Sequence, residues 1–528
     1  MTLLTLDRVA CAAPDGSLLF HDLTLSLDRR RVGLVGRNGS GKTTLLRTIA
    51  GELPLAAGSV VVSGRLAMLR QLPDDPNASL AEALGLQAAL ARLRRIEAGA
   101  PLPHDWDEAD WTLPARLESA AGRAGLVFDP RRRLGTLSGG ERTRLMLARL
   151  LLDEPEVLLM DEPTNNLDAD GRAAVTRLLA EWKGGAIVAS HDRGLLSGMD
   201  AIVELTGSGV HTVGGGWDVF VQRREDERQR AATTLETSEA RLRQARREAQ
   251  AEREKQERRA GRGRRIAQSG SAPKILLGAQ KRRAEATTGR RYRLGEDLVA
   301  QAADAFAQAR DRVDVLDPVR VTLPPCGLPA GHTVLRADGL TCEHGGRRLF
   351  GPLDLAITGP RRIAVGGANG TGKSTLLRIV AGLQEPSSGQ VRQRTHRIAL
   401  LDQDLALLPR TTALDAMRAL NPGMSEHEAH AALAAFGFRN RWAGREVVGL
   451  SGGERVRLAL AGLFSGAEPP WLLILDEPTN HLDFATVELL ESALSGYDGA
   501  VLCVSHDPAF LAAIGIEATI VLGAQERD

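Results

Sequence analysis

Short apolar runs that end in glycine or in paired acids occur twice along the chain. The runs Val32–Val35 and Ile363–Val365 each precede a glycine-rich loop, and a leucine-rich segment follows each loop. Two further runs, VLLM before Asp161 and LLIL before Asp476, end in two acidic residues. Short apolar runs bounded by turn residues are typical of strands buried in a parallel sheet. The pattern therefore predicts an α/β fold that is built twice.

The repeat extends over most of the chain. Segment 32–51, VGLVGRNGSGKTTLLRTIAG, returns at 363–382 as IAVGGANGTGKSTLLRIVAG, an offset of 331 residues. LSGGERTRLMLA, LLMDEPTNNLD and VASHDRGLL also return in near-identical form, at offsets of 313 to 315 residues. Four motif pairs in the same order indicate a duplicated domain. The differing offsets place about 16 to 18 extra residues in the first copy.

Between the copies the pattern changes to long helices. The stretch from Trp217 to about Arg259 has no proline and many helix formers, and Leu235, Leu242 and Ala249 recur every seven residues. A second stretch, about 294–316, repeats apolar residues at spacings of four and three, namely Leu298, Ala302, Ala305, Ala309, Val313 and Leu316. Two such stripes predict an antiparallel hairpin. The segment between them, 261–291, is basic and is expected to be a loop.

Both glycine-rich loops, GRNGSGKT (36–43) and GANGTGKS (367–374), fit the phosphate-binding pattern G-x-x-x-x-G-K-[ST] in a strand–loop–helix context. Glycines let backbone N–H groups converge on phosphate oxygens, and the helix N-terminus adds positive potential. Lys42 and Lys373 are expected to hold the β- and γ-phosphates. Thr43 and Ser374 are expected to bind Mg²⁺. The other expected ATP-binding residues of the two loops are Gly36, Asn38, Gly39, Ser40, Gly41, Thr44, Gly367, Asn369, Gly370, Thr371, Gly372 and Thr375.

The paired acids fit a metal ligand followed by a base. Asp161 and Asp476 end their apolar runs, where a carboxylate can organise Mg²⁺ at the carboxyl edge of a sheet. Glu162 and Glu477 come next and are placed to polarise the attacking water. A solvated acid at a strand end is the alternative interpretation, and the repetition of the pair argues against it.

With LSGGE occurring some 20 residues before each DEP, the chain resembles the ATP-binding cassette superfamily over both repeats. The resemblance implies that Gln71 and Gln403 contact Mg²⁺ and water, and that His191 and His506 reach the γ-phosphate. It also implies that Asp168 and Asp483 lie at the interface between cassettes. Each ATP would then be clamped between one P-loop and the opposite LSGGE, so Lys42 pairs with Ser451 and Lys373 with Ser138. The LSGGE residues expected at the nucleotides are Ser138, Gly139, Gly140, Ser451, Gly452 and Gly453.

The expected architecture is α/β, with two P-loop ATP-binding cassette domains joined by a helical-hairpin linker. The predicted domains are 1–216, 217–325 and 326–528. Both sites keep the full set of catalytic side chains, so both should hydrolyse ATP. One departure concerns adenine: where the superfamily usually has an aromatic residue, the chain has Ala13 and His344. This leaves ATP and GTP as open alternatives.

The overall composition says little about function, but the local distribution of charge along the chain is informative. Net charge is +1, and the four cysteines are far apart without metal-ligand spacing. No window approaches the roughly 18 to 20 apolar residues that span a bilayer, so a soluble cytoplasmic protein is expected. Residues 222–294, in contrast, hold 22 Lys and Arg against 10 Asp and Glu, an excess of 12 positive charges.

Fused cassettes joined by a basic helical linker, together with DEPTNHLD and the GGGWDVF stretch at 214–220, resemble the ABC-F subfamily. The resemblance implies a monomer whose cassettes pair within one chain and whose linker contacts ribosomal and transfer RNA. Clustered Arg and Lys also suit RNA on physical grounds. The candidate RNA-binding residues are Arg262, Arg264, Arg265, Lys274, Lys281, Arg282, Arg283, Arg290 and Arg291.

Three functions remain open from the sequence. The first is a ribosome-associated ATPase, either a translation factor or a protein that confers antibiotic resistance by protecting ribosomes. The second is an ATPase that acts on branched DNA, because the linker charge suits duplex phosphates as well. The third is the energising subunit of a membrane transporter, which would leave the basic linker without a role. A charged coiled coil that binds nothing is the alternative interpretation of the linker.

Overall fold

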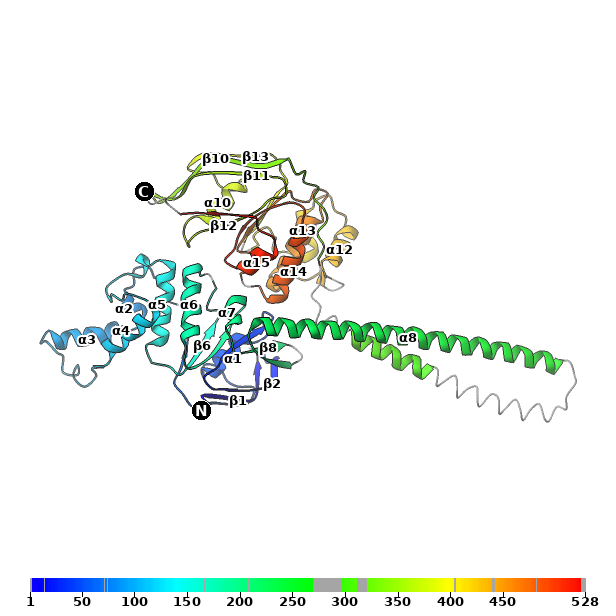
Figure 1. Ribbon diagram of the computed structural model, residues 1–528, viewed down its shortest axis with the longest axis horizontal. Helices are drawn as coiled ribbons and strands as arrows, with labels where there is room; N and C mark the ends of the chain where they lie inside the picture. Colours follow the sequence, from blue (N-terminus) through cyan, green and yellow to red (C-terminus); the bar gives the residue numbers. More distant parts are fainter. Residues whose placement is uncertain are drawn as a thin grey trace. The chain divides into compact units, whose positions relative to one another are not determined.

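A computed structural model describes most of the chain. The described residues are 2–13, 15–70, 72–73, 75–165, 167–206, 209–268, 296–310, 321–402, 405–438, 442–480 and 482–523. They form two units, Met1–Phe220 with Val319–Asp528, and Val221–Pro318. The first unit contains both copies of the repeat, and the second contains most of the linker (Figure 1).

The first copy contains two sheets. A three-stranded antiparallel sheet has the order β2-β1-β4, formed by β2 (Leu18–Leu27), β1 (Leu4–Ala12) and β4 (Ala57–Val62). A six-stranded sheet has the order β5-β6-β7-β3-β8-β9, formed by β5 (Leu66–Met68), β6 (Val157–Asp161), β7 (Gly185–Ala189), β3 (Arg31–Gly36), β8 (Ala201–Thr206) and β9 (Gly209–Gly214). Only the β8–β9 pair of this sheet is antiparallel. The apolar runs predicted as buried strands are thus β3 and β6.

The second copy repeats this topology. Its antiparallel sheet has the order β11-β10-β13, formed by β11 (Arg347–Thr358), β10 (Thr333–His344) and β13 (Ser388–Gln393). Its parallel sheet has the order β14-β15-β16-β12-β17, formed by β14 (Ile398–Leu401), β15 (Leu472–Asp476), β16 (Ala500–Val504), β12 (Arg362–Gly366) and β17 (Ala518–Val521). Strands β15 and β16 are buried throughout, which explains their unbroken apolar sequences.

Helices follow the strands in the same order in both copies. The first copy has α1 (Lys42–Ile49), α2 (Leu80–Ala83), α3 (Gln87–Glu97), α4 (Leu113–Ala124), α5 (Gly139–Leu151), α6 (Ala169–Glu181) and α7 (Arg193–Ser197). The second has α10 (Lys373–Val380), α11 (Ala413–Leu420), α12 (Glu426–Ala435), α13 (Gly452–Phe464), α14 (Phe484–Ser495) and α15 (Pro508–Ala513). The extra residues of the first copy add a helix before its LSGGE segment, so that α2, α3 and α4 stand where the second copy has α11 and α12.

The linker unit is helical, as predicted. Helix α8 (Trp217–Gln268) is one unbroken helix, and residues 296–310 form a second one (Figure 1). An ion pair at 3.5 Å joins Arg253 to Glu296, and Leu242 and Ala309 are buried. The ion pair joins the two helices, and the two buried positions belong to the predicted apolar stripes. Val313 and Leu316 of the predicted second stripe lie outside the described residues.

The predicted boundary of the linker loop was wrong at one end. The loop was expected to begin at Gly261, but α8 continues to Gln268. The two glycines at 261 and 263 each weaken a helix by only about 1 kcal/mol, and the surrounding Arg, Ala and Gln are good helix formers. The first residue that cannot continue a helix is Pro273, which lies outside the described residues.

The four cysteines, Cys11, Cys326, Cys342 and Cys503, are all buried free thiols. Burial raises the pKa of each, that of Cys326 to about 11. None of them forms a disulfide. Across the described residues, no helix is long and apolar enough to cross a membrane.

Candidate functional site

The two P-loop lysines are folded back over their own loops. Strand β3 ends at Gly36, and the Nζ of Lys42 donates to the Gly36 carbonyl at 2.8 Å. In the second copy the Nζ of Lys373 donates to the Gly367 carbonyl at 2.8 Å and to that of Ala368 at 3.1 Å. Both lysines are only 8% exposed. Each ammonium group is therefore held at the rim of a loop whose pattern is that of a phosphate cradle.

A glycine before each of these lysines is required by the geometry. Gly41 and Gly372 precede α1 and α10 with φ of 96° and 88°, in the left-handed region. A Cβ atom on Gly372 would lie 2.9 Å from the ring of Phe350, and one on Gly41 would lie 3.1 Å from that of Phe20. The chain thus turns tightly into a helix whose first N–H groups have no intrahelical acceptor.

The paired acids lie where their strands end. Asp161 and Asp476 are the last residues of β6 and β15, and Glu162 and Glu477 follow with φ of 45° and 47°. Side chains other than glycine seldom adopt this left-handed conformation, and its cost of about 1–3 kcal/mol persists only where the surroundings enforce it. Here the backbone N–H of each glutamate donates to the neighbouring strand, at 2.8 Å from Glu162 and 2.9 Å from Glu477.

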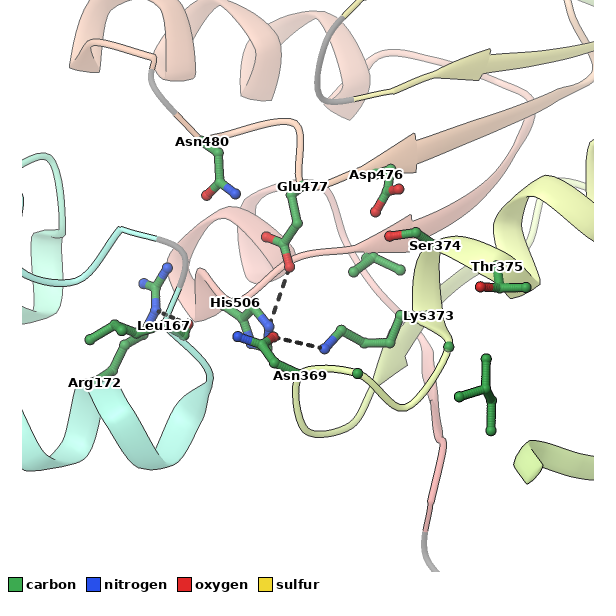
Figure 2. A pocket seen from close by; sticks show the side chains of 14 residues that line it. Leu167, Arg172, Asn369, Lys373, Ser374, Thr375, Asp476, Glu477, Asn480 and His506 are labelled. Carbon is green, nitrogen blue, oxygen red and sulfur yellow. Dashed lines mark hydrogen bonds and ion pairs between the residues drawn. The ribbon is translucent and has the colours of Figure 1, made fainter. Parts of the chain in front are cut away.

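A histidine faces each of these glutamates. The backbone N–H of His191 donates to Oε2 of Glu162 at 3.2 Å, and its Nε2 lies 3.4 Å from Oε1. The Nε2 of His506 lies 3.3 Å from Oε1 of Glu477 (Figure 2). Burial lowers the pKa of His191 to about 3 and that of His506 to about 4. Both imidazoles are therefore neutral near pH 7 and can donate one hydrogen bond and accept another.

Burial has the opposite effect on the glutamates. It raises the pKa of Glu162 to about 7, against the attraction of Lys42. Burial also raises the pKa of Glu477, but two cations, Lys373 and Arg172, oppose the rise there. A carboxyl group with a pKa near neutrality is well matched to accept a proton from water at physiological pH.

Several polar atoms at the two sites lack hydrogen-bond partners. Within the described part of the chain, the buried atoms without a partner include both ring nitrogens of His191, Nε2 of His506, Oε2 of Glu477, Oδ1 of Asp476 and Oγ of Ser40. Orphaned buried polar groups are rare and need an explanation. Their convergence around the P-loops fits a ligand that brings both hydrogen-bond acceptors and a cation, such as a nucleoside triphosphate with Mg²⁺.

The residues present also fit a magnesium ion that takes only a few of its ligands from the protein. Ser374 hydrogen-bonds to Asp476, whose Oδ1 is one of the unpartnered atoms. Among the described residues no group of three or more His, Cys, Asp or Glu could hold a metal. A single hydroxyl and a single carboxylate suit Mg²⁺, which keeps several waters and takes further ligands from phosphates.

Each LSGGE segment starts a helix with a capping box. In α5 the Ser138 N–H donates to Glu141 at 2.9 Å and the Glu141 N–H donates to the Ser138 hydroxyl at 3.2 Å. Ser451 and Glu454 repeat this arrangement in α13, at 2.7 and 3.4 Å. The boxes fix the glycines at the positive end of each helix, where their N–H groups suit an anion.

The two copies meet at these motifs. A Cβ atom on Gly139 would lie 3.8 Å from Cβ of Asn369, so the first LSGGE faces the second P-loop. Burial lowers the pKa of both P-loop lysines, and an acid of the opposite copy opposes each shift. That acid is Asp168 at Lys373 and Asp483 at Lys42. Each P-loop thus lies beside groups of the other copy.

A cavity at the second P-loop shows this composite lining directly. Lys373, Ser374, Asp476, Glu477 and His506 line it from the second copy, and Leu167 and Arg172 line it from the first (Figure 2). Asp168 and Asp483 themselves cap α6 and α14, accepting at 3.0 Å from the N–H of Gly171 and of Thr486.

Some predicted residues cannot be placed. Gln71 and Gln403 lie outside the described residues, as do Lys274, Lys281, Arg282, Arg283, Arg290 and Arg291. The side chains of Arg262, Arg264 and Arg265 are likewise not described, although their backbone belongs to α8. His344 is exposed at the end of β10.

Sequence reasoning missed two side chains, one from each copy, that lie at the site of the opposite copy. Arg172 reaches the second site from α6, and the ring of Phe484 lies 5.0 Å from that of His191. The matching positions in the opposite copy are Val487 and Ala169. Because the two residues differ between the copies, comparing the repeats gives no signal for either.

Comparisons with known proteins agree with this geometry. Residues 20–165 and 350–480 match the family model described as ABC transporter. Two P-loop domains of this kind, each with an acidic strand end and a facing histidine, define a twin-cassette ATPase.

The relatives place the chain more closely. The tylosin resistance ATP-binding protein TlrC of Streptomyces fradiae is 33% identical, over 94% of this chain and 95% of that protein. The energy-dependent translational throttle protein EttA of Mycobacterium tuberculosis is 31% identical, over 96% and 89%. The ATP-binding protein Uup of Haemophilus influenzae is 30% identical, over 97% and 77%. The chain belongs to the ABC-F subfamily of the ATP-binding cassette family.

Solved structures support the fold alone. The archaeal ribosome recycling factor aABCE1, solved with the ribosomal stalk protein aP1, aligns with a TM-score of 0.55 at 19% identity, over 98% of this chain and 87% of that one. A structure titled RNase-L Inhibitor aligns with a TM-score of 0.53, also at 19% identity.

Proposed function

We propose that the chain hydrolyses ATP at two composite sites, with Glu162 and Glu477 as general bases. Lys42 and Lys373 would hold the β- and γ-phosphates. Thr43 with Asp161 and Ser374 with Asp476 would hold Mg²⁺, which would neutralise phosphate charge. The neutral His191 and His506 would orient the γ-phosphate and the attacking water. The buried glutamates, the orphaned polar atoms and the tight turns into α1 and α10 support these roles.

Each bound ATP would contact both cassettes and so hold them together. Site one combines Lys42 with Ser451, and site two combines Lys373 with Ser138, each across the interface. Two observations support this: the charge of Asp483 opposes the burial that lowers the pKa of Lys42, and the first LSGGE approaches Asn369. ATP would stabilise the closed pair, and removal of the γ-phosphate would break the interactions that hold it closed.

The two sites should differ in their response to acid. Glu162 has a pKa of about 7, so below neutral pH it becomes protonated and can no longer accept a proton from water. We expect kcat/KM at site one, measured in Glu477→Gln protein, to fall below about pH 7, because this ratio reports groups of the free enzyme. At site two, measured in Glu162→Gln protein, Arg172 should move the fall to lower pH. Coincident profiles would contradict the assignment.

We further propose that the ATPase acts on the ribosome through its linker. The observation that carries this proposal is the excess of 12 positive charges in residues 222–294, set in a chain of net charge +1. Between 260 and 295 only Glu285 offsets the cations, whereas glutamate is frequent earlier in α8. Cations without acidic neighbours suit phosphate and base stacking in RNA. The relatives named for translational throttling and for tylosin resistance belong to the same subfamily.

The partner can be tested by sedimentation. The Glu162→Gln, Glu477→Gln protein, mixed with cell lysate, is expected to pellet with 70S ribosomes when ATP is present and to stay in the supernatant without it. Branched DNA is the second candidate, since the same cations suit duplex phosphates. Comparing affinities for ribosomes and for DNA junctions at equal salt separates the two, because unspecific binding falls steeply with salt. Preference for junctions would overturn the ribosome proposal.

The basic segment 261–291 of the linker, called the linker tip below, should contribute to binding but not to basal hydrolysis. Replacing the nine candidate RNA-binding residues by Ser is expected to weaken 70S binding. It should also make the log–log dependence of affinity on salt shallower, by about 0.7 for each phosphate that is no longer neutralised. A control replaces Arg223 and Arg243, which pair within α8 with Glu227 and Glu239 and should affect binding less for each charge removed. Loss of basal ATPase in the tip variant would instead show that the linker is structural.

A further inference from the structure

One side chain of the second cassette is built into the core of the first. Phe484 begins α14, directly after Asp483, and is only 5% exposed. It belongs to the apolar cluster formed by β6, β7, α5 and α6 of the first copy. Burying a large aromatic side chain of one cassette in the core of the other helps to hold the two together.

The ring of Phe484 contacts two different elements of the first cassette. On one side it meets the ring of His191 edge-on, with centroids 5.0 Å apart. On the other its ring centroid lies 4.1 Å from that of Trp217, with the two planes tilted by 31°, and the Trp217 centroid lies 5.3 Å from that of Phe220. Trp217 is the first residue of α8, so this aromatic series runs from the histidine of site one to the origin of the linker helix.

The described part of the other half of the interface shows no such series. The position that matches Phe484 is Ala169, which is exposed at the start of α6. The contact is therefore specific to site one and does not follow from the duplication.

We propose that Phe484 is a positioning residue that couples site one to the linker helix: it holds the ring of His191 against Glu162 while it packs on Trp217. Because the three rings are in series, a shift of the first turn of α8 moves Phe484, and with it the imidazole that faces Glu162. Conversely, separation of the cassettes withdraws Phe484 from both rings at once. Site two, where Ala169 offers no ring, hydrolyses without sensing the linker.

A second contact of the same interface provides a control. Arg193 forms a bidentate pair with Glu491 of α14, at 2.8 and 3.0 Å, with both side chains less than one fifth exposed. Glu491 lies on the same helix as Phe484, but its bonds go to Arg193 and not to the aromatic series. Glu491→Gln therefore weakens the interface without changing the aromatic series. It tests whether a weaker interface alone explains the result of replacing Phe484.

The first test measures hydrolysis in a single turnover at each site. Phe484→Leu, which keeps apolar volume but removes the ring, is expected to slow site one about tenfold in Glu477→Gln protein, as misplaced catalytic groups do. In Glu162→Gln protein, where only site two turns over, the loss should be several-fold smaller. Equal losses at both sites would overturn the proposal, as would the same selective loss in Glu491→Gln. Phe484→Ala, if it folds, should show the larger selective loss.

The second test reads the coupling itself. Hydrogen exchange of residues 217–225 is compared with and without ATP in Glu162→Gln, Glu477→Gln protein. We expect ATP to slow exchange there, and Phe484→Leu to abolish that change while Glu491→Gln retains it. An ATP effect that survives in Phe484→Leu would overturn the coupling.

The inference rests on the proposed role of His191, and one variant separates the two. If His191→Ala leaves hydrolysis at site one unchanged, the proposed catalytic role of His191 fails. If His191→Ala abolishes it while Phe484→Leu has no effect, only the positioning role fails.

Discussion

Replacing Glu162 and Glu477 together by glutamine is expected to leave ATP binding intact and to lower turnover by about 10²- to 10⁴-fold, the usual contribution of a general base. Glutamine has the shape of glutamate but cannot accept a proton from water. Both residues have a left-handed backbone conformation, and the backbone N–H of each donates a hydrogen bond to the adjacent strand. The substitution does not change these backbone atoms. The variant should therefore accumulate with ATP bound and the cassettes closed.

Two measurements check this expectation. Steady-state phosphate release gives the turnover, and the nucleotide retained after gel filtration gives the bound ATP. Two retained ATP molecules per chain with little ADP would support both composite sites. Turnover near the wild-type rate would rule out the general-base assignment. Loss of binding together with turnover would mean that the glutamates organise the site rather than act on water.

Replacing the P-loop lysines by alanine should remove ATP binding itself, whereas the double glutamine variant keeps ATP bound and loses only turnover. Each ammonium group is almost fully buried and is held over its loop by backbone carbonyls. Alanine provides no cation at this position for the phosphates. A hydrogen bond to a charged group contributes about 1.5–3 kcal/mol, so losing one of them costs about 10- to 150-fold in affinity and losing two costs more. We expect Lys42→Ala and Lys373→Ala each to leave one ATP bound per chain, and the double variant to bind none.

Calorimetric titration with Mg-ATP in the Glu162→Gln, Glu477→Gln background gives the stoichiometry without consuming the ligand. Lys183→Ala is the matched control, because Lys183 is exposed between α6 and β7 and takes no part in either site. Unchanged stoichiometry in the double lysine variant would refute the assignment of the two loops as phosphate cradles.

The duplication explains why so much of the fold could be predicted from the sequence. A motif that occurs twice in the same order carries its own control, so strands β3, β6, β12 and β15 and the helices after them could be placed from residues alone. The pairing of acids with strand ends followed from the same argument. The left-handed backbone of Glu162 and Glu477, in contrast, depends on a bond to the neighbouring strand that no local pattern records.

The parts that escaped prediction are those where the copies differ. Arg172 and Phe484 lie against residues of the opposite copy, and their counterparts Val487 and Ala169 have different chemistry, so comparing the repeats does not reveal them. The end of α8 escaped for another reason. Segment 261–291 was expected to be a loop throughout, but the two isolated glycines at 261 and 263 lie among strong helix formers and reduce helix stability without ending the helix. The roles of Gln71 and Gln403 stay predictions.

The buried cysteines have a practical consequence for studying how the cassettes move. Their thiols are shielded, and their raised pKa values leave little reactive thiolate near neutral pH. A maleimide dye should therefore attach selectively to a cysteine introduced on the surface, with the native sequence otherwise intact. Dyes on the two cassettes, or on a cassette and α8, would report opening and closing in single molecules.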